Sequence, residues 1–95
     1  MKIETTPEYD SWLDSLHDLI GRARIQARTE RLAEGNPGQF RNLDGALSEL
    51  KIDVGPGYRV YYTQRGNVLI LLLCGGNKST QQKDIRLARK LLKGL

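Results

Sequence analysis

The segment from residue 47 to residue 80 constrains the fold more than any other part of the chain. Polar and apolar residues alternate in ELKID (49–53) and in YRVYY (58–62), which predicts two strands, each with one polar and one apolar face. The residues between them, GPG (55–57), are typical of a short hairpin loop, because glycine supplies positive φ and proline fixes φ. We therefore predict an antiparallel hairpin at the centre of the fold.

Three polar side chains share one face of this predicted hairpin. Residues opposite one another in an antiparallel pair point to the same side, so a register that keeps the apolar faces together also groups the polar side chains. We expect Lys51, Arg59 and Tyr61 to lie together on a solvent-exposed face. The opposite, apolar face is predicted to hold Leu50, Ile52, Val54, Tyr58, Val60 and Tyr62.

Further strands complete the predicted sheet. A turn at residues 65–67 leads into VLILLLC (68–74), a run that is apolar on both faces and therefore belongs in the middle of a sheet or under a helical layer. Residues 2–5 form a plausible edge strand. Residues 40–43 are interpreted as a connection that leads into the central hairpin.

Helices are predicted on both sides of this strand region. Residues 7–34 have apolar residues at helical spacing after Thr6 as N-cap, and Gly21 divides them into two consecutive helices that pack on the sheet. Near the C-terminus, Ser79 and Gln82 have the spacing of a capping box, which predicts a helix that runs to about Lys93. Its outer face carries Lys83, Arg86, Arg89, Lys90 and Lys93.

Length and composition indicate one small α+β domain over residues 1–95, with a twisted, mostly antiparallel sheet, an N-terminal helical hairpin on one face and a C-terminal helix. The first twenty residues hold five carboxylates and no apolar block, so we expect no signal peptide, and the run 68–74 is too short to span a bilayer. The single cysteine, Cys74, suits a reducing, cytoplasmic compartment and is interpreted as a small buried hydrophobe.

The net charge of +4 is distributed unevenly along the chain. Residues 1–50 hold six Lys/Arg and nine Asp/Glu, whereas residues 51–95 hold nine Lys/Arg and two Asp/Glu. A basic half of this kind favours an anionic partner, most commonly a phosphate backbone. A solvated helix face on an ordinary protein is the alternative interpretation, and charge alone does not decide between them.

No nucleotide-binding or metal-binding motif is present in the sequence. Gly75-Gly76-Asn77-Lys78 precedes the predicted C-terminal helix, and backbone N–H groups beside a helix N-terminus suit an anion. The loop lacks the spacing of a P-loop, however, and there is no Rossmann fingerprint, metal-ligand cluster or Ser/His/Asp set. We therefore expect no cofactor and no metal ion.

Taken together, these motifs resemble a known protein family. The chain is similar to the RelE/ParE superfamily of toxins from bacterial toxin–antitoxin modules, in the HigB-like branch called addiction module killer proteins. The likeness covers nearly the whole chain and keeps the order of its elements. It rests on the helical pair and on ELKI (49–52), GPGYRVYY (55–62) and LCGGNKSTQ (73–81), followed by Asp84-Ile85 and Ala88.

The resemblance implies a RelE-like fold and a ribosome-dependent endoribonuclease that cuts mRNA and is held inactive by a cognate antitoxin. By similarity, the arginine after Gly-Tyr falls on Arg59, and the basic residue of the preceding strand falls on Lys51. The sequence departs from the founding members in lacking a cation in the middle of the last strand and a tail that bears a catalytic tyrosine. Lys78 and Tyr61 are the residues that we assign to those roles.

RNA cleavage by the 2′-hydroxyl needs a base, charge stabilisation at phosphorus and protonation of the leaving oxygen. Arg59 suits the second task because a guanidinium binds phosphate oxygens and keeps its proton. Lys51 is the candidate base, since a neighbouring positive charge favours a neutral amine. Lys78 or Tyr61 serves as proton donor or phosphate clamp in this hypothesis.

Two other functions fit the same sequence. ParE-like relatives inhibit DNA gyrase by binding and cut no RNA, in which case the basic C-terminal helix would be the docking surface. A basic interaction domain with neither activity is the third interpretation. Both toxin interpretations require a cognate antitoxin, for which we expect a helix-turn-helix DNA-binding motif; operator DNA would be bound only through the antitoxin complex, and no membrane is involved.

Overall fold

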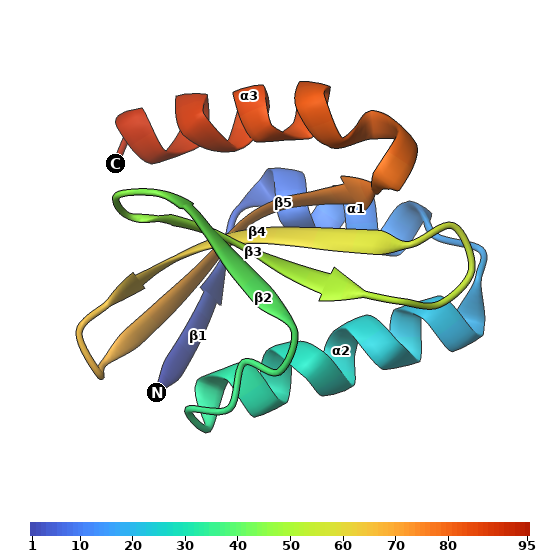
Figure 1. Ribbon diagram of the computed structural model, residues 1–95, viewed down its shortest axis with the longest axis horizontal. Helices are drawn as coiled ribbons and strands as arrows, with labels where there is room; N and C mark the ends of the chain where they lie inside the picture. Colours follow the sequence, from blue (N-terminus) through green and yellow to red (C-terminus); the bar gives the residue numbers. More distant parts are fainter.

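A mixed five-stranded sheet forms the middle layer of the computed structural model, which describes residues 1–95 (Figure 1). The strands lie in the order β1-β5-β4-β3-β2; β1 pairs with β5 in parallel, and the other three pairings are antiparallel. The elements in chain order are β1 (Lys2–Thr5), α1 (Pro7–Ser15), α2 (Leu19–Ala33), β2 (Phe40–Asp44), β3 (Leu47–Ile52), β4 (Tyr58–Arg65), β5 (Leu69–Asn77), a 3₁₀ turn (Lys78–Thr80) and α3 (Gln81–Lys93).

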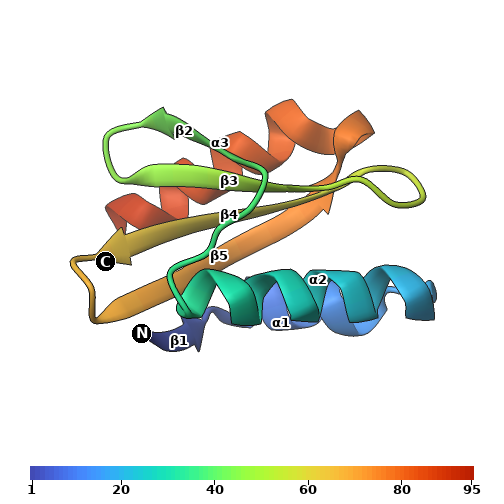
Figure 2. The ribbon, with the colours of Figure 1, turned by 60° about the horizontal axis from the view of Figure 1, so that its bottom comes forward.

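The helices cover both faces of the sheet. Figure 2 shows α1 and α2 on one face of the sheet, with α3 on the other. This confirms an α+β domain with a mostly antiparallel sheet, the N-terminal helices on one side and a separate C-terminal helix. Residues 69–74 of the run predicted to be interior lie in β5, between β1 and β4, whereas Val68 precedes the strand and is exposed; residues 2–5 form the predicted edge strand.

The break between α1 and α2 lies earlier than predicted. The Thr6 hydroxyl caps α1 as expected by accepting from the Tyr9 N–H at 3.0 Å. Helix α1 ends at Ser15, and Asp18 caps α2 by accepting from the Gly21 N–H at 2.9 Å. Gly21 is therefore inside the first turn of α2. Packing requires a glycine at this position, since a Cβ on residue 21 would lie 2.6 Å from the Tyr58 ring.

The predicted apolar face of the hairpin is confirmed. Leu50, Ile52, Tyr58, Val60 and Tyr62 are all at most 4 % exposed and belong to one core cluster. This cluster also contains Ile70 and Leu72 of β5, Tyr9 of α1, and Ile25 and Leu32 of α2. The alternating pattern thus identified this buried face of the hairpin correctly. It could do so because the residues that pack against α1 and α2 must be apolar.

The opposite face was predicted to be exposed to solvent, and this prediction is wrong for most of its length. Tyr61 is fully buried and Arg59 is 7 % exposed, whereas Lys51 is half-buried. A second core cluster forms on this face between α3 and the sheet, because α3 places Ile85 and Ala88 against it. Its other members are Leu47, Tyr61, Leu73 and Cys74.

Two further details at the ends of the sheet differ from expectation. Residues 40–44 are strand β2, which pairs with β3 at the edge, and are not a connection. The predicted Ser79–Gln82 capping box is replaced by one between Asn77 and Thr80, so α3 proper begins at Gln81. The buried position of Cys74 is confirmed. No helix combines the length and the apolar character needed to cross a membrane.

Candidate functional site

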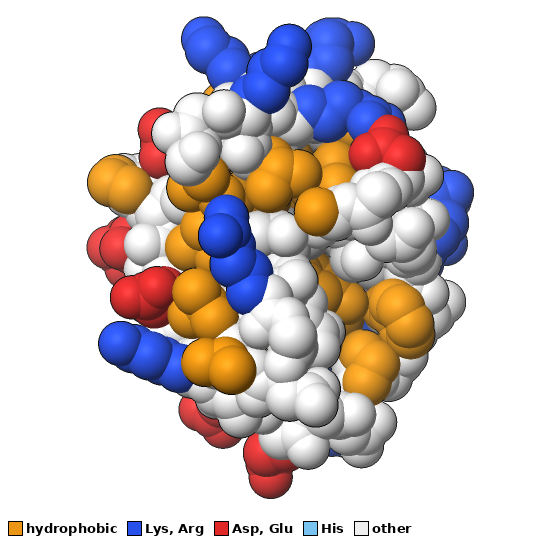
Figure 3. Space-filling model, turned by 90° about the vertical axis from the view of Figure 1, so that its left-hand side faces the viewer, with side chains coloured by type: hydrophobic (Ala, Val, Ile, Leu, Met, Phe, Trp, Pro, Cys, Tyr) orange, Lys and Arg blue, Asp and Glu red, His pale blue; other side chains and the backbone are white.

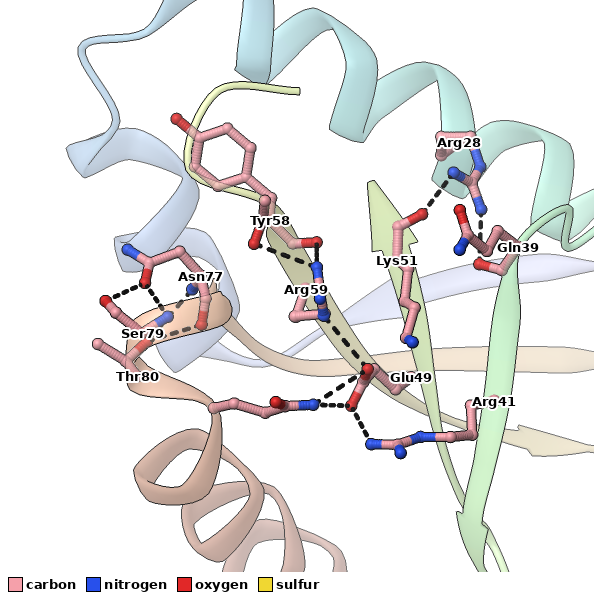
Figure 4. Close-up of polar contacts among 12 residues, drawn as sticks. Arg28, Gln39, Arg41, Glu49, Lys51, Tyr58, Arg59, Asn77, Ser79 and Thr80 are labelled. Carbon is pink, nitrogen blue, oxygen red and sulfur yellow. Dashed lines mark hydrogen bonds and ion pairs between the residues drawn. The ribbon is translucent and has the colours of Figure 1, made fainter. Parts of the chain in front are cut away.

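The candidate site lies where β3 and β4 pair beside the start of α3. Lys51 and Arg59 are direct partners in the antiparallel register, and Arg59 pairs on its other side with Gly76 of β5. The Lys51 and Arg59 side chains therefore point to the same face of the sheet, as the sequence predicted (Figure 4). Lys51 forms no ion pair, so this site contains a cation without a carboxylate partner.

A buried carboxylate lies under this pair of cations. The Glu49 side chain is fully buried, two residues before Lys51 on the same face of β3. Its Oε1 atom lies 3.3 Å from Arg59 Nε, and its Oε2 atom lies 3.4 Å from Arg41 Nη2. The Gln81 amide donates to Oε2 at 3.1 Å (Figure 4). Strands β2 and β4 and the first turn of α3 thus converge on a single carboxylate.

Arg59 has most of its donors already in use. Nη1 donates to the carbonyl oxygens of Gly57 at 3.2 Å and Tyr58 at 3.1 Å, and Nε faces Glu49. The Nε contact is an ion pair rather than an aligned hydrogen bond, since Nε is a buried donor without a hydrogen-bond partner. A guanidinium has five N–H donors, so the two on Nη2 are the ones left for a ligand. Arg59 can therefore contact a phosphate through Nη2, while its other two nitrogens are held by the protein.

The structure also brings Lys78 to this site. A Cβ placed on Gly57 would lie 3.5 Å from Arg59 Nη1 and 3.6 Å from Lys78 Cβ, so the two residues flank the same glycine. The Lys78 N–H donates to the Gly57 carbonyl at 2.8 Å, which fixes the 3₁₀ turn against the β3–β4 loop. Lys78 itself is exposed. It is thus an accessible cation at the rim of the site.

Tyr61 does not belong to the accessible part of the site. It is fully buried, and its hydroxyl has no hydrogen-bond partner. Burial, with a further contribution from the negative charge of Glu49, raises the pKa of Tyr61 well above its ordinary value. Tyr61 belongs to the core beneath α3, where a substrate does not reach its hydroxyl. Its expected role as proton donor therefore has no geometric support.

The outer face of α3 is strongly basic. Five Lys or Arg side chains of this helix are exposed, and its single acidic residue, Asp84, is buried. Figure 3 shows Lys and Arg side chains gathered at the top of the molecule, where α3 lies, with hydrophobic side chains exposed below them. The largest hollow, about 550 Å³, lies between the C-terminal half of α3 and Asp44 of β2. That hollow is separate from the residues at Lys51 and Arg59.

Sequence reasoning identified three of the residues gathered here and missed three others. Lys51, Arg59 and Lys78 come together as expected. Glu49, Arg41 and Gln81 were missed. Glu49 could have been found, because it lies two residues before Lys51 on the same strand and therefore on the same face. No group of three or more His, Cys, Asp or Glu side chains lies where it could hold a metal ion.

Comparison with known proteins adds one full-length relative. A protein of Haemophilus influenzae, described as an uncharacterized protein, is 47 % identical over 95 residues, which span this whole chain and 96 % of that protein. The chain belongs to the same family as this Haemophilus protein. No family model matches the sequence. The relative's description names no activity.

Proposed function

We propose that this protein is a RelE/ParE-like toxin of the HigB-like branch, and that it is a ribosome-dependent endoribonuclease. The observation that carries the proposal is the direct pairing of Lys51 with Arg59 on one face, with Lys78 at the rim. Basic residues from three elements, Lys51 of β3, Arg59 of β4 and Lys78 of the 3₁₀ turn, lie near one another there, and among them only Arg59 is paired with a carboxylate. A surplus of positive charge at one point of a sheet suits the phosphate of an RNA strand.

The proposed reaction is an intramolecular displacement at phosphorus. The 2′-oxygen forms a bond to the neighbouring phosphorus, the bond from phosphorus to the 5′-oxygen breaks, and a 2′,3′-cyclic phosphate and a 5′-hydroxyl result. Lys51 is the proposed general base for the 2′-hydroxyl proton, and Lys78, an exposed lysine at the rim, delivers a proton to the 5′-oxygen. The Nη2 donors of Arg59 stabilise the charge that develops on the phosphoryl oxygens.

The site carries few groups that can act as acid or base. This agrees with an enzyme whose substrate is held in place by a separate macromolecule. Holding the attacking and leaving groups in line supplies a large part of the barrier reduction in such reactions. The ribosome would provide this positioning for mRNA in its decoding site. The protein would therefore act in the cytoplasm, and free RNA would be a poor substrate.

The proposed partner is a cognate antitoxin. The antitoxin would cover the cations of the site. A second contact area is offered by the basic outer face of α3, together with the exposed hydrophobic side chains beside it. Acidic and apolar side chains on the antitoxin would complement such a surface. Operator DNA would be bound through a helix-turn-helix motif of the antitoxin.

A second candidate function has its own observation. Arg59 is 7 % exposed and is paired with a buried carboxylate, whereas α3 presents its five cations to solvent. That distribution favours a protein that inhibits DNA gyrase by binding through α3, as ParE-like relatives do. In that case the pairing of Lys51 with Arg59 would be structural.

One experiment separates the two functions. The protein is expressed from an inducible promoter in cells without its antitoxin, and both cellular RNA and DNA are examined. The nuclease proposal expects truncated mRNA with new 5′ ends inside translated regions and no early DNA damage. DNA breaks and an SOS response with intact mRNA would support the gyrase inhibitor, and growth without either effect would reject both.

A further inference from the structure

The buried carboxylate of Glu49 is the strongest feature that the proposed function leaves unused. It touches side chains from three different elements: Arg41 of β2, Arg59 of β4 and Gln81 of α3. Its own side chain is fully buried, which is rare for a glutamate and occurs when the charge is paired. Glu49 therefore contributes either through its negative charge or through its packing and hydrogen-bond contacts. A variant that removes only the charge separates the two contributions.

The charge of Glu49 is matched mainly by Arg59. The Arg41 side chain is 51 % exposed, and Gln81 is neutral, whereas the Arg59 side chain is 8 % exposed. Attraction between two charges is strongest where water is excluded from both, so the contact with Arg59 is the dominant one. Arg41 and Gln81 complete the coordination of the carboxylate from its more open side.

This arrangement fixes the direction in which Arg59 points. The carboxylate holds the guanidinium at Nε, and the carbonyl oxygens of Gly57 and Tyr58 hold it at Nη1. A planar group restrained along two of its edges has little rotational freedom. Its third edge, Nη2, is then presented in one fixed direction on the face shared with Lys51.

We propose that Glu49 is a positioning residue, which orients the Arg59 guanidinium toward the scissile phosphate and links it to the first turn of α3 through Gln81. The proposal rests on the nuclease function. Glu49 is not a catalytic residue in this scheme, because its buried oxygens touch protein side chains and do not touch RNA. Its negative charge also lowers the positive electrostatic potential at the site. Glu49 therefore improves the orientation of Arg59 but weakens the binding of an anionic ligand.

The test is the Glu49→Gln variant, which keeps the size of the side chain and removes its charge. Three quantities are measured: the single-turnover cleavage rate of ribosome-bound mRNA, the affinity for a fully 2′-O-methylated RNA oligonucleotide that cannot be cleaved, and the NMR signal of the Arg59 Nε–H group. Glu30→Gln is the matched control, since Glu30 is an exposed glutamate on α2 that forms no ion pair.

The expected result is a split between rate and affinity. The cleavage rate falls on the order of 100-fold, as small misplacements of a catalytic group do, while the oligonucleotide binds as tightly as before or more tightly. The Arg59 Nε–H signal broadens as the guanidinium becomes mobile. The Glu30→Gln control leaves all three quantities unchanged.

Two results would overturn the proposal. A cleavage rate within a few-fold of wild type with an unchanged Arg59 signal would show that Glu49 does not orient Arg59. A parallel loss of rate and of affinity in a folded Glu49→Gln variant would indicate a purely structural carboxylate. If wild type cuts no ribosome-bound RNA, the nuclease function fails by itself, and the Arg59 signal still decides whether Glu49 holds that side chain.

A second variant keeps the test decisive if Glu49→Gln does not fold. Gln81→Glu in the Glu49→Gln background returns a carboxylate to the site, on the residue whose amide lies 3.1 Å from Glu49 Oε2. It is expected to restore the folded protein without restoring the cleavage rate, because the charge then lies on α3 and not beside Arg59 Nε. Recovery of the full rate would contradict a positioning role for Glu49.

Discussion

Lys51 and Arg59 lie opposite each other in the β3–β4 ladder, yet their electrostatic environments differ. Arg59 is nearly covered and paired with Glu49, whereas Lys51 is half-buried and forms no ion pair. Removing either cation therefore has a different effect on the fold. This difference determines which substitution gives a clean test of the proposed nuclease.

Lys51→Ala is the cleaner substitution. The Lys51 side chain makes no ion pair, and the contacts of this residue with Arg28 and Gln39 use backbone atoms, which alanine retains. We expect loss of growth arrest and of mRNA cleavage with a thermal midpoint close to wild type. The measurement is colony formation after induction, alongside a melting curve of the purified protein. Arg65→Ala, which removes an exposed cation at the far end of β4, should remain toxic.

Arg59→Ala is expected both to abolish growth arrest and to destabilise the fold. It leaves Glu49 as a buried charge without its main partner, and breaking a buried pair costs about 3–5 kcal/mol. We therefore expect a lower free energy of unfolding in urea titrations. Arg59→Lys keeps the charge and should be more stable than Arg59→Ala, while losing activity because a lysine has no Nη2. Equal stability of the two variants would contradict this account of the ion pair.

Gly75 and Gly76 of β5 are expected to tolerate no side chain. A Cβ at Gly75 would lie 2.2 Å from the Trp12 ring on one face of the sheet, and one at Gly76 would lie 1.7 Å from the Asp84 carboxylate on the other. Either alanine substitution should lower the free energy of unfolding by about 1–3 kcal/mol, the usual cost of overpacking. Gly94→Ala is the control, because the nearest atom to its Cβ is 3.6 Å away. Urea denaturation of the three variants measures the difference.

Cys74 should be chemically inert while the protein is folded. Its side chain is buried beneath α3, and burial raises the pKa of its thiol from 9.0 to about 12, with a smaller contribution from Asp84. A thiol whose folded-state pKa is raised favours folding below its unfolded pKa, and this contribution is lost as the pH rises from about 9 toward 12. We expect labelling by a thiol reagent at pH 8 to proceed only as fast as the protein unfolds. Rapid stoichiometric labelling of native protein would show that α3 does not cover Cys74.

The acid side of the stability profile should depend on Asp18. The Gly21 N–H and then the Tyr58 hydroxyl donate to its carboxylate and hold the pKa of Asp18 below its ordinary value. The Asp18 carboxylate therefore binds a proton more readily in the unfolded chain than in the folded protein. Its contribution to the free energy of unfolding is present above the ordinary pKa of Asp and is lost as the pH falls below about 4. Asp18→Asn should flatten this part of the profile while it still caps α2. Urea midpoints between pH 2 and pH 6 measure the change, with the pH values chosen around the ordinary pKa.

Much of the fold followed from local patterns. Alternation in residues 49–62 located the hairpin and one core face, since a strand with one buried face must place its apolar residues on that side. The apolar run of β5 marked an interior strand for a different reason, since a strand covered on both faces is apolar on both. Strand β2 was missed because its two apolar residues, Phe40 and Leu43, are three positions apart and show no alternation, and four of its five residues are exposed.

The candidate site divides in the same way. The sequence by itself determined that Lys51 and Arg59 share one face of the hairpin, because in an antiparallel pair any register that keeps the apolar faces together also keeps these two residues on one side. Only the tertiary structure decided that α3 covers this face, buries Tyr61 and joins Glu49 to Arg59 and Gln81. Those contacts join residues far apart in the chain, and the position of a helix over a sheet depends on packing that no local pattern specifies.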